Sequence, residues 1–146
     1  MTKRNAVAED LHRSALRLLR RLRKADETLE ISTARLSALS VLVFVGPQSV
    51  GGLARIEQVS QPTMTSLTQG MIRQGLIRAK PDPNDRRVRR LVATAKGKKL
   101  LHRGRQKRIE MLSSMLQRFN VEELQMLARA ATLMESMLLD EQTFLD

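Results

Sequence analysis

The 146-residue sequence contains no cysteine, no tryptophan and no tyrosine, and it has only two histidines. Without cysteine the chain forms no disulfide, no thiolate metal site and no thiol-based redox sensor. His12 and His102 fall on different predicted helices and lack neighbouring ligands, so no metal site is predicted. No nucleophile stands beside a base in the sequence. We therefore predict no catalytic site, no enzyme activity and no cofactor.

Aromatic residues make up only 2% of the chain, although apolar residues reach 42%. The core must then consist of Leu, Val, Ile, Ala and the eight Met, which favours packed helices over a β-sandwich. Long hydrophobic runs are also missing, because the longest apolar-rich stretch, residues 36–45, is shorter than the ~20 residues that span a bilayer. The N-terminus shows no apolar segment of a secretory signal. We expect a single-domain cytoplasmic protein without membrane contact.

Acidic residues are scarce over most of the chain. Lys and Arg number 26 against 15 acidic residues, which gives a formal charge of +11. Residues 1–110 carry 24 basic and 9 acidic side chains, whereas residues 111–146 carry 2 and 6. This distribution predicts contact with a polyanion, either nucleic acid or an anionic membrane surface, through the first region and not through the C-terminal tail.

Hydrophobic periodicity and capping residues predict a chain of mostly α-helix with one small β-hairpin, an α+β architecture. The predicted helices cover residues 6–26, 33–45, 50–58, 61–74, 95–118 and 121–139. Ser49, Ser60 and Thr94 are expected N-caps, and Asn120 with Glu123 is expected to form a capping box. Residues 76–80 and 88–93 are expected to be strands, because a turn-rich segment with two prolines separates them. The helix over 33–45 is apolar on nearly every side, which predicts a central, buried helix.

Two short helices joined by a three-residue turn, over residues 50–58 and 61–74, match the helix–turn–helix arrangement. The second helix of such a pair lies in the major groove of DNA. Met64, Leu67, Met71 and Ile72 are expected to hold it to the core. The remaining face is the predicted DNA-binding surface: Ser60, Gln61, Thr63, Thr65, Ser66, Gln69 and Arg73. Gln pairs with adenine and hydroxyls reach phosphates or bases, although the pattern also fits an ordinary solvated face.

The hairpin carries the highest density of positive charge. Residues 72–108 include 14 basic residues and only two acidic ones, Asp82 and Asp85. A basic projecting turn suits phosphate contact and entry into a narrow minor groove, although a solvated charged loop has the same composition. Asp85 lies close enough in sequence to Arg87 to fix the direction of its guanidinium.

The order of these segments resembles the MarR family of bacterial and archaeal regulators over essentially the whole chain. The segments that carry the resemblance are Leu53-Ala54, Ser60-Gln61-Pro62-Thr63-Met64-Thr65, Gly75-Leu76-Ile77-Arg78, Asp82-Pro83-Asn84-Asp85-Arg86-Arg87 and Thr94-Ala95-Lys96-Gly97. The Asp-Pro-x-Asp-Arg-Arg segment followed by Thr-x-x-Gly is the specific part, because a helix–turn–helix pattern alone is weak evidence.

The resemblance implies a winged helix–turn–helix protein that forms a homodimer and binds a pseudo-palindromic operator in double-stranded DNA, most often as a repressor. It implies one domain over residues 1–146, with dimerisation helices in 1–31 and 95–146 and a DNA-binding region in 32–94. By position, Arg87 and Arg86 enter the minor groove and Asp85 orients Arg87. Ser66 departs from the family pattern, since some members place an arginine there.

The resemblance also implies a small aromatic or phenolic effector bound between the dimerisation helices and the winged region. Leu, Val and Met would line that region, with His12 or Arg13 nearby, and a packed core without an effector fits the sequence equally well. Two other functions stay open at this point. A non-specific or architectural nucleic-acid binder would bind every duplex alike, and a helical protein-interaction module would bind none.

Overall fold

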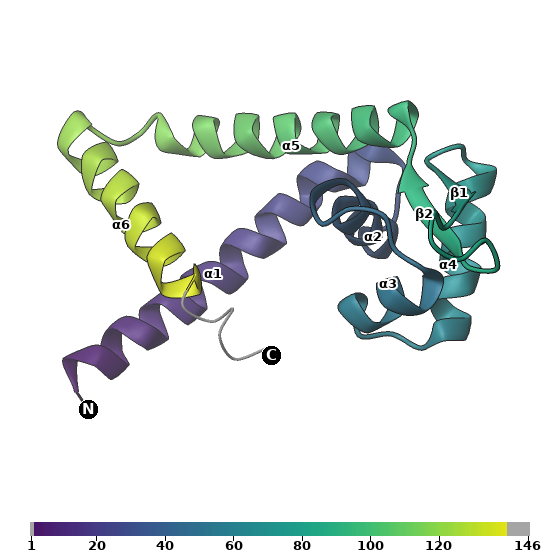
Figure 1. Cartoon of the computed structure of the whole chain (residues 1–146). Helices are drawn as coiled ribbons and strands as arrows, with labels where there is room; N and C mark the ends of the chain where they lie inside the picture. The colour runs from purple at the N-terminus through teal and green to yellow at the C-terminus, as the bar shows by residue number, and fades with distance from the viewer. Residues whose placement is uncertain (1, 140–146) are drawn as a thin grey trace. The chain divides into compact units, whose positions relative to one another are not determined.

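The computed structural model describes residues 2–139 and divides the chain into two compact units, Met1–Ile109 and Glu110–Asp146. Both units consist mostly of helices, and the first unit also contains a two-stranded antiparallel hairpin (Figure 1). The elements are α1 (Lys3–Asp26), the 3-10 turn η1 (Glu27–Leu29), α2 (Thr33–Phe44), α3 (Val50–Glu57), α4 (Gln61–Arg73), β1 (Ile77–Pro81), β2 (Arg89–Ala93), α5 (Ala95–Leu116) and α6 (Val121–Leu139). The predicted fold class is confirmed, with most element ends within two residues of expectation.

Serine and threonine caps set where the helices begin. Ser49 and Ser60 each have extended backbone and accept a hydrogen bond from the amide three residues later, at Gly52 and Thr63. These bonds satisfy amides that otherwise lack a partner in the first turn. Ser32 caps α2 and Thr94 caps α5 in the same way. The predicted caps Ser49, Ser60 and Thr94 are confirmed. The predicted start of the first helix at residue 6 is three residues late, because Thr2 caps α1 and the helix begins at Lys3.

The core of the first unit forms around the middle of α2, where Ala38 and Leu39 are fully buried. Side chains from each neighbouring element pack on them: Leu53, Met64, Met71, Ile77, Leu91, Leu100 and Leu101. The prediction that α2 is the central helix is confirmed for its middle turns. It is wrong for the C-terminal end, where Phe44 and Val45 are 74% and 66% exposed.

A glycine lets α5 begin against the hairpin. A Cβ atom added at Gly97 would lie 2.1 Å from the carbonyl oxygen of Leu76, so only glycine allows this approach. The amide of Thr94 donates to that same oxygen at 3.0 Å. The first turn of α5 is therefore fixed to the chain segment that leads from α4 into the wing.

Helices α1 and α6 bury almost nothing within their own units. Ala25 is the only buried residue of α1, and no residue of α6 is buried. Asn120 and Glu123 form the predicted reciprocal capping box at the start of α6, with bonds of 2.9 and 3.0 Å. No helix among residues 2–139 is long and apolar enough to cross a membrane.

Candidate nucleic-acid interface

The turn between α3 and α4 brings two helix ends together. Gln58 adopts the left-handed conformation with φ of 56°, which ends α3, and the amide of Val59 donates to the carbonyl of Ala54. Ser60 then caps α4, and Pro62 occupies the first turn, where a missing N–H leaves no bond unmade. The predicted three-residue turn is thus built from one left-handed residue and one cap.

Helix α4 turns one face to the core and the other to solvent. Met64, Thr68 and Met71 are buried, and the Thr68 hydroxyl donates to the carbonyl of Met64 at 2.8 Å. That bond satisfies the buried Thr68 hydroxyl, and the sequence analysis had not included Thr68 among the buried residues of this helix. Leu67 packs against the core as predicted, whereas Ile72 is 42% exposed, so its predicted burial is wrong.

The structure brings all seven residues of the predicted α4 surface onto the solvent side. Thr65 is partly covered, and the other six are exposed. Five neighbouring residues line a hollow there: Gln61, Pro62, Thr65, Ser66 and Gln69. Three of the hydroxyls are engaged locally, because those of Ser60 and Thr63 contact each other at 2.7 Å and that of Thr65 donates to the carbonyl of Gln61. The side-chain amides of Gln61 and Gln69, the Ser66 hydroxyl and the Arg73 guanidinium are not used in these local bonds.

The hairpin is a short ladder with a structured tip. Its register pairs Ile77 with Ala93 at the base and Pro81 with Arg89 next to the tip. Beyond the ladder, the amide of Asp82 donates to the carbonyl of Val88 at 2.9 Å. Two further hydrogen bonds, of 2.7 and 3.3 Å, join Leu91 to Gln48 in the α2–α3 connection. This isolated bridge, absent from the sequence analysis, ties the wing to the helical part of the unit.

Arginines at the tip are exposed and available. Arg86 and Arg87 are in solvent, and neither guanidinium forms an ion pair with a carboxylate in the part of the chain that the structure describes. Asp85 does not contact the guanidinium of Arg87 as predicted. Its carboxylate accepts a hydrogen bond from the backbone amide of Arg87 at 3.0 Å, which is a local Asx turn. Asp85 thus shapes the backbone of the tip.

Asp82 is the buried charge of the hairpin, at 5% exposure. One carboxylate oxygen accepts from the amides of Asn84 and Asp85 at 2.7 and 3.2 Å, and the other accepts from Nε of Arg90. The hydrogen bond from Arg90 is the main cause that holds the pKa of Asp82 below its ordinary value, with the Asn84 amide second. Sequence analysis counted Asp82 only as one of two acids in a basic region.

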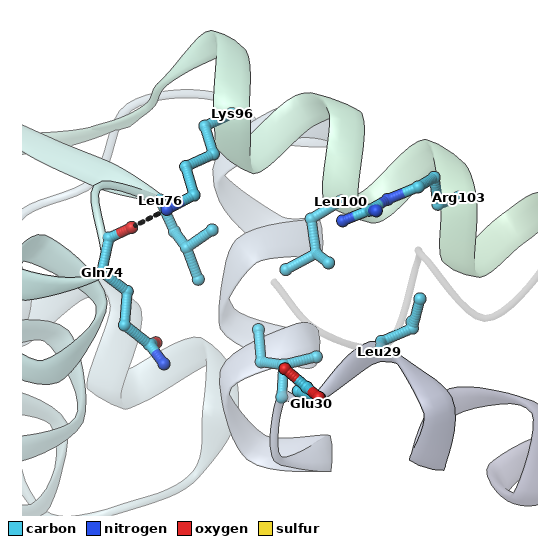
Figure 2. A pocket seen from close by; sticks show the side chains of 8 residues that line it. Leu29, Glu30, Gln74, Leu76, Lys96, Leu100 and Arg103 are labelled. Atoms are coloured by element: carbon cyan, nitrogen blue, oxygen red, sulfur yellow. Dashed lines mark hydrogen bonds between the residues drawn. The ribbon is translucent and has the colours of Figure 1, made fainter.

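Two hollows lie where the helices of the first unit meet. Figure 2 shows the first, a cavity of about 230 Å³ at the junction of η1, the end of α4 and the start of α5. Apolar side chains and a few charged groups line it: Leu29, Glu30, Ile31, Gln74, Leu76, Lys96, Leu100 and Arg103. Nζ of Lys96 donates to the carbonyl of Gln74 at 2.7 Å across its rim. His12 and Arg13, which were expected nearby, are not among these residues.

The second hollow, of about 340 Å³, lies between α2 and α5 and is strongly basic. Its lining comprises Ser40, Val43, Phe44, Lys98, Leu101, His102, Arg105 and Arg108. Arg108 is already engaged, since Nη1 donates to the carboxylate of Asp26 at 2.6 Å. Within residues 2–139, no three His, Asp or Glu side chains gather as metal ligands would.

The sequence is similar to a family of transcriptional regulators. A sequence model of the MarR family matches residues 31–88. An HTH-type transcriptional regulator of Mycobacterium bovis is 33% identical over 128 residues, which is 88% of this chain and 90% of the relative. Another, from Mycobacterium leprae, is 32% identical over 127 residues, which is 87% of this chain and 89% of the relative.

Solved structures show the same architecture. A MarR family protein from Bacillus stearothermophilus is 27% identical and superposes with a TM-score of 0.78, covering 94% of this chain and 98% of that one. A transcriptional regulator of Thermotoga maritima gives 0.82 at 22% identity, covering 97% and 99%. A mutant of MepR from Staphylococcus aureus, bound to an oligodeoxyribonucleotide, gives 0.70 at 21% identity, covering 90% and 97%.

Proposed function

Because the chain belongs to the MarR family of DNA-binding transcriptional regulators, we propose that it is a sequence-specific homodimeric repressor. Two copies bind a pseudo-palindromic operator, and each copy contributes α4 and one wing. In this proposal residues 1–146 form one domain, with a DNA-binding region in 32–94 and dimerisation segments in 1–31 and 95–146. Residues 140–146 lie outside those described. Operators belong to the chromosome, which places the protein in the cytoplasm.

The exposed face of α4 supports base recognition in the major groove. Gln61 and Gln69 present amides, which make bidentate contacts to adenine, and hydroxyls surround them. Ser66 stands where some family members have an arginine, so this helix offers guanine one strong donor fewer. Arg73, at the C-terminal end of α4, is its only cation. Helix α4 therefore contributes base recognition through hydrogen bonds, and most of the positive charge that attracts DNA lies outside α4.

The single observation that carries the proposal is the pair of unpaired arginines at the wing tip. Arg86 and Arg87 project into solvent from a turn whose backbone is fixed by Asp82 and Asp85. Minor grooves that are narrow have enhanced negative potential, which attracts inserted guanidinium groups. A wing with fixed backbone and free cations suits that contact.

Exposed apolar side chains on α1 and α6 support a second copy of this chain as their cover. Helix α6 exposes Val121, Leu124, Met126, Leu127, Leu133, Met134, Met137, Leu138 and Leu139. Large exposed apolar patches mark interaction sites. The two helices also carry opposite charge, because α1 has 8 basic and 3 acidic residues, whereas α6 has 3 acidic residues and one arginine. Association of α1 with the α6 of a second copy buries both faces and pairs their charges.

A small effector that releases the operator would suit the cavity of Figure 2. The cavity joins the end of α4, through Gln74, to η1, so a ligand there changes how the DNA-reading helix packs. Its volume is below the usual ~300–1,000 Å³ of drug-sized sites, which favours a single-ring ligand. Leu29 and Leu100 supply apolar walls, and Arg103 with Lys96 favours an anionic substituent. Benzoate and phenol are suitable probes, and Arg103→Ala should weaken the response to benzoate more than to phenol.

Selection of bound duplexes from a random pool tests the proposal. The expected result is a pseudo-palindrome with half-sites about one helical turn apart. Arg87→Ala should then weaken binding to the selected duplex about 5- to 150-fold for each wing, since a lost arginine contact costs ~1–3 kcal/mol, while the dimer persists. Arg118→Ala, which removes the same charge outside the proposed DNA-binding region 32–94, is the matched control, and the mass of the dimer is measured for both variants. Equal affinity for random duplex would show a non-specific binder instead, and no duplex binding would show a protein-interaction module.

A further inference from the structure

Asp82 is a carboxylate of the wing that Coulomb attraction to DNA does not explain. Asp82 lies in a hairpin that is otherwise rich in cations, and a negative charge there lowers affinity for phosphates. It is almost completely buried, and its three hydrogen bonds leave neither oxygen unused. One oxygen faces the backbone of the tip and the other faces Arg90. Asp82 therefore links the tip to the guanidinium of Arg90.

Arg90 continues this link to the helical part of the unit. Its Nη1 donates to the carbonyl of Pro47 in the α2–α3 connection at 3.4 Å, and its Nε donates to Asp82. The neighbouring residue, Leu91, pairs with Gln48 of the same connection. A continuous set of contacts thus runs from the loop before α3 to the backbone that carries the tip arginines.

Polar contacts bridge a hollow beside the tip. The hollow has a volume of about 400 Å³, and its lining comes from both sides: Pro47, Lys80, Pro81, Asp82, Pro83, Asn84, Arg90 and Val92. The contacts that cross it therefore contribute to the direction of the tip. Arg90 is the side chain that crosses from the hairpin to Pro47.

We propose that Arg90 and Asp82 are positioning residues for DNA binding, which aim the tip arginines at the minor groove without contacting DNA themselves. The inference rests on the proposed role of the wing. Arg90 differs from Arg86 and Arg87 because its Nε and Nη1 donate to Asp82 and Pro47 within the protein. Asp82 has no donor to offer a phosphate. The pair fixes the angle between the wing and helices α3 and α4. This angle allows the wing to contact the minor groove while α4 contacts the major groove.

Asp82→Asn gives a test in which the two explanations predict opposite signs. The substitution removes a negative charge, so charge alone predicts tighter binding. The asparagine oxygen still accepts from the tip amides, but the ion pair with Arg90 is lost, so a positioning role predicts about tenfold weaker binding to the operator. Glu57→Gln is the matched control: it removes one negative charge from the same unit and keeps an acceptor for the Ser37 hydroxyl. It should leave binding unchanged or slightly tighter.

Arg90→Lys provides the second variant, because it keeps the charge but loses the guanidinium fork. Lysine binds phosphate well as a point charge, so a direct phosphate contact would retain most of its affinity. A positioning role predicts a loss similar to that of Asp82→Asn. It also predicts a less than additive loss when Arg90→Lys is added to Arg87→Ala, because Arg90 acts in part through Arg87, whereas independent contacts add. Hydroxyl-radical footprints should lose the protection under the wing and keep that under α4.

The outcomes separate this inference from the proposed function. If Arg87→Ala leaves operator affinity unchanged, the role of the wing itself is wrong. If Arg87→Ala weakens binding while Asp82→Asn tightens it or leaves it unchanged, only the positioning role is overturned. The same holds if Arg90→Lys and Arg87→Ala are additive. Thermal unfolding and dimer mass are measured for each variant, and the footprint with Arg90→Lys decides the matter should Asp82→Asn unfold.

Discussion

The segment from α2 to the start of α5 buries most of its apolar side chains, whereas α1 and α6 leave most of theirs in solvent. In the first region Leu39, Leu53 and Met71 are fully buried and the exposed face of α4 is polar. In the second, α6 has no buried residue and nine exposed large apolar ones. Most of the stability of a protein helix comes from packing of its apolar face rather than from helix propensity. The winged region is therefore stabilised by its own core, and the terminal helices depend on association.

Adding negative charge to the apolar surface of α6 is the most direct test of this difference between the two regions. The double variant Leu127→Glu with Leu138→Glu should abolish the dimer and leave the winged region folded. Operator affinity should fall by about 10²- to 10⁴-fold, because the second half-site is no longer held at high effective concentration. Sedimentation equilibrium and gel-shift titration measure the two effects.

The matched control adds the same charge on the opposite side of α6, through Gln125→Glu with Thr132→Glu. This variant should remain dimeric. A dimer of undiminished stability in the Leu127 and Leu138 variant would show that α6 does not lie in the interface, and the comparison between the two regions would lose its basis.

Gly97→Ala breaks the other side of the comparison, the internal packing of the winged region. The added Cβ would meet the Leu76 carbonyl at 2.1 Å and Leu39 at 3.0 Å, so the start of α5 must move. We expect the free energy of unfolding to fall by about 1–3 kcal/mol, as for other overpacked sites. Gly51→Ala is the control, since its nearest neighbour would be at an ordinary 3.6 Å. It should stabilise α3 by about 0.5–1 kcal/mol in urea denaturation.

Two helix caps sharpen the comparison within the winged region. Ser49→Ala and Ser60→Ala each remove a side-chain acceptor from a first turn, and each should cost about 1 kcal/mol of stability. Only Ser60→Ala should also weaken operator binding, because Ser60 belongs to the proposed DNA-facing surface and contacts the Thr63 hydroxyl. Equal loss of operator affinity in both variants would indicate that Ser60 acts through helix stability alone.

Local chemistry made much of this fold predictable from the sequence. Caps such as Ser49, Ser60 and Thr94 act over three residues, so a short stretch of sequence contains the whole interaction. The seven residues proposed for the α4 surface were placed correctly in solvent because helical periodicity separates them from Met64 and Met71. The hairpin was equally visible, since Asp82 to Asp85 and Pro83 lie between its strands and Pro81 ends the first strand.

Contacts between distant segments were not predictable in this way. Nothing in the sequence pairs Gln48 with Leu91 or Arg90 with Pro47, which lie more than forty residues apart. The burial of Thr68 was missed because its hydroxyl is satisfied by its own helix. Asp85 was assigned to a guanidinium, but a carboxylate in a tight turn reaches the nearby amide of Arg87 first. In each case the deciding partner was a backbone atom.

Acid titration of the Asp82–Arg90 pair is the smallest effect and concerns only the winged region. The hydrogen bond from Arg90, followed by that from the Asn84 amide, lowers the pKa of Asp82 from its ordinary 3.8. A lowered folded-state pKa means that the ionised carboxylate stabilises the fold above the unfolded-state pKa, and that this contribution is lost as the pH falls through the folded-state value. The difference in Tm between the wild type and Asp82→Asn should therefore be constant from pH 7 to about 5 and shrink below about 4. Calorimetry over pH 7 to 3 measures it, and a difference that grows on acidification would show that the ion pair does not stabilise the wing.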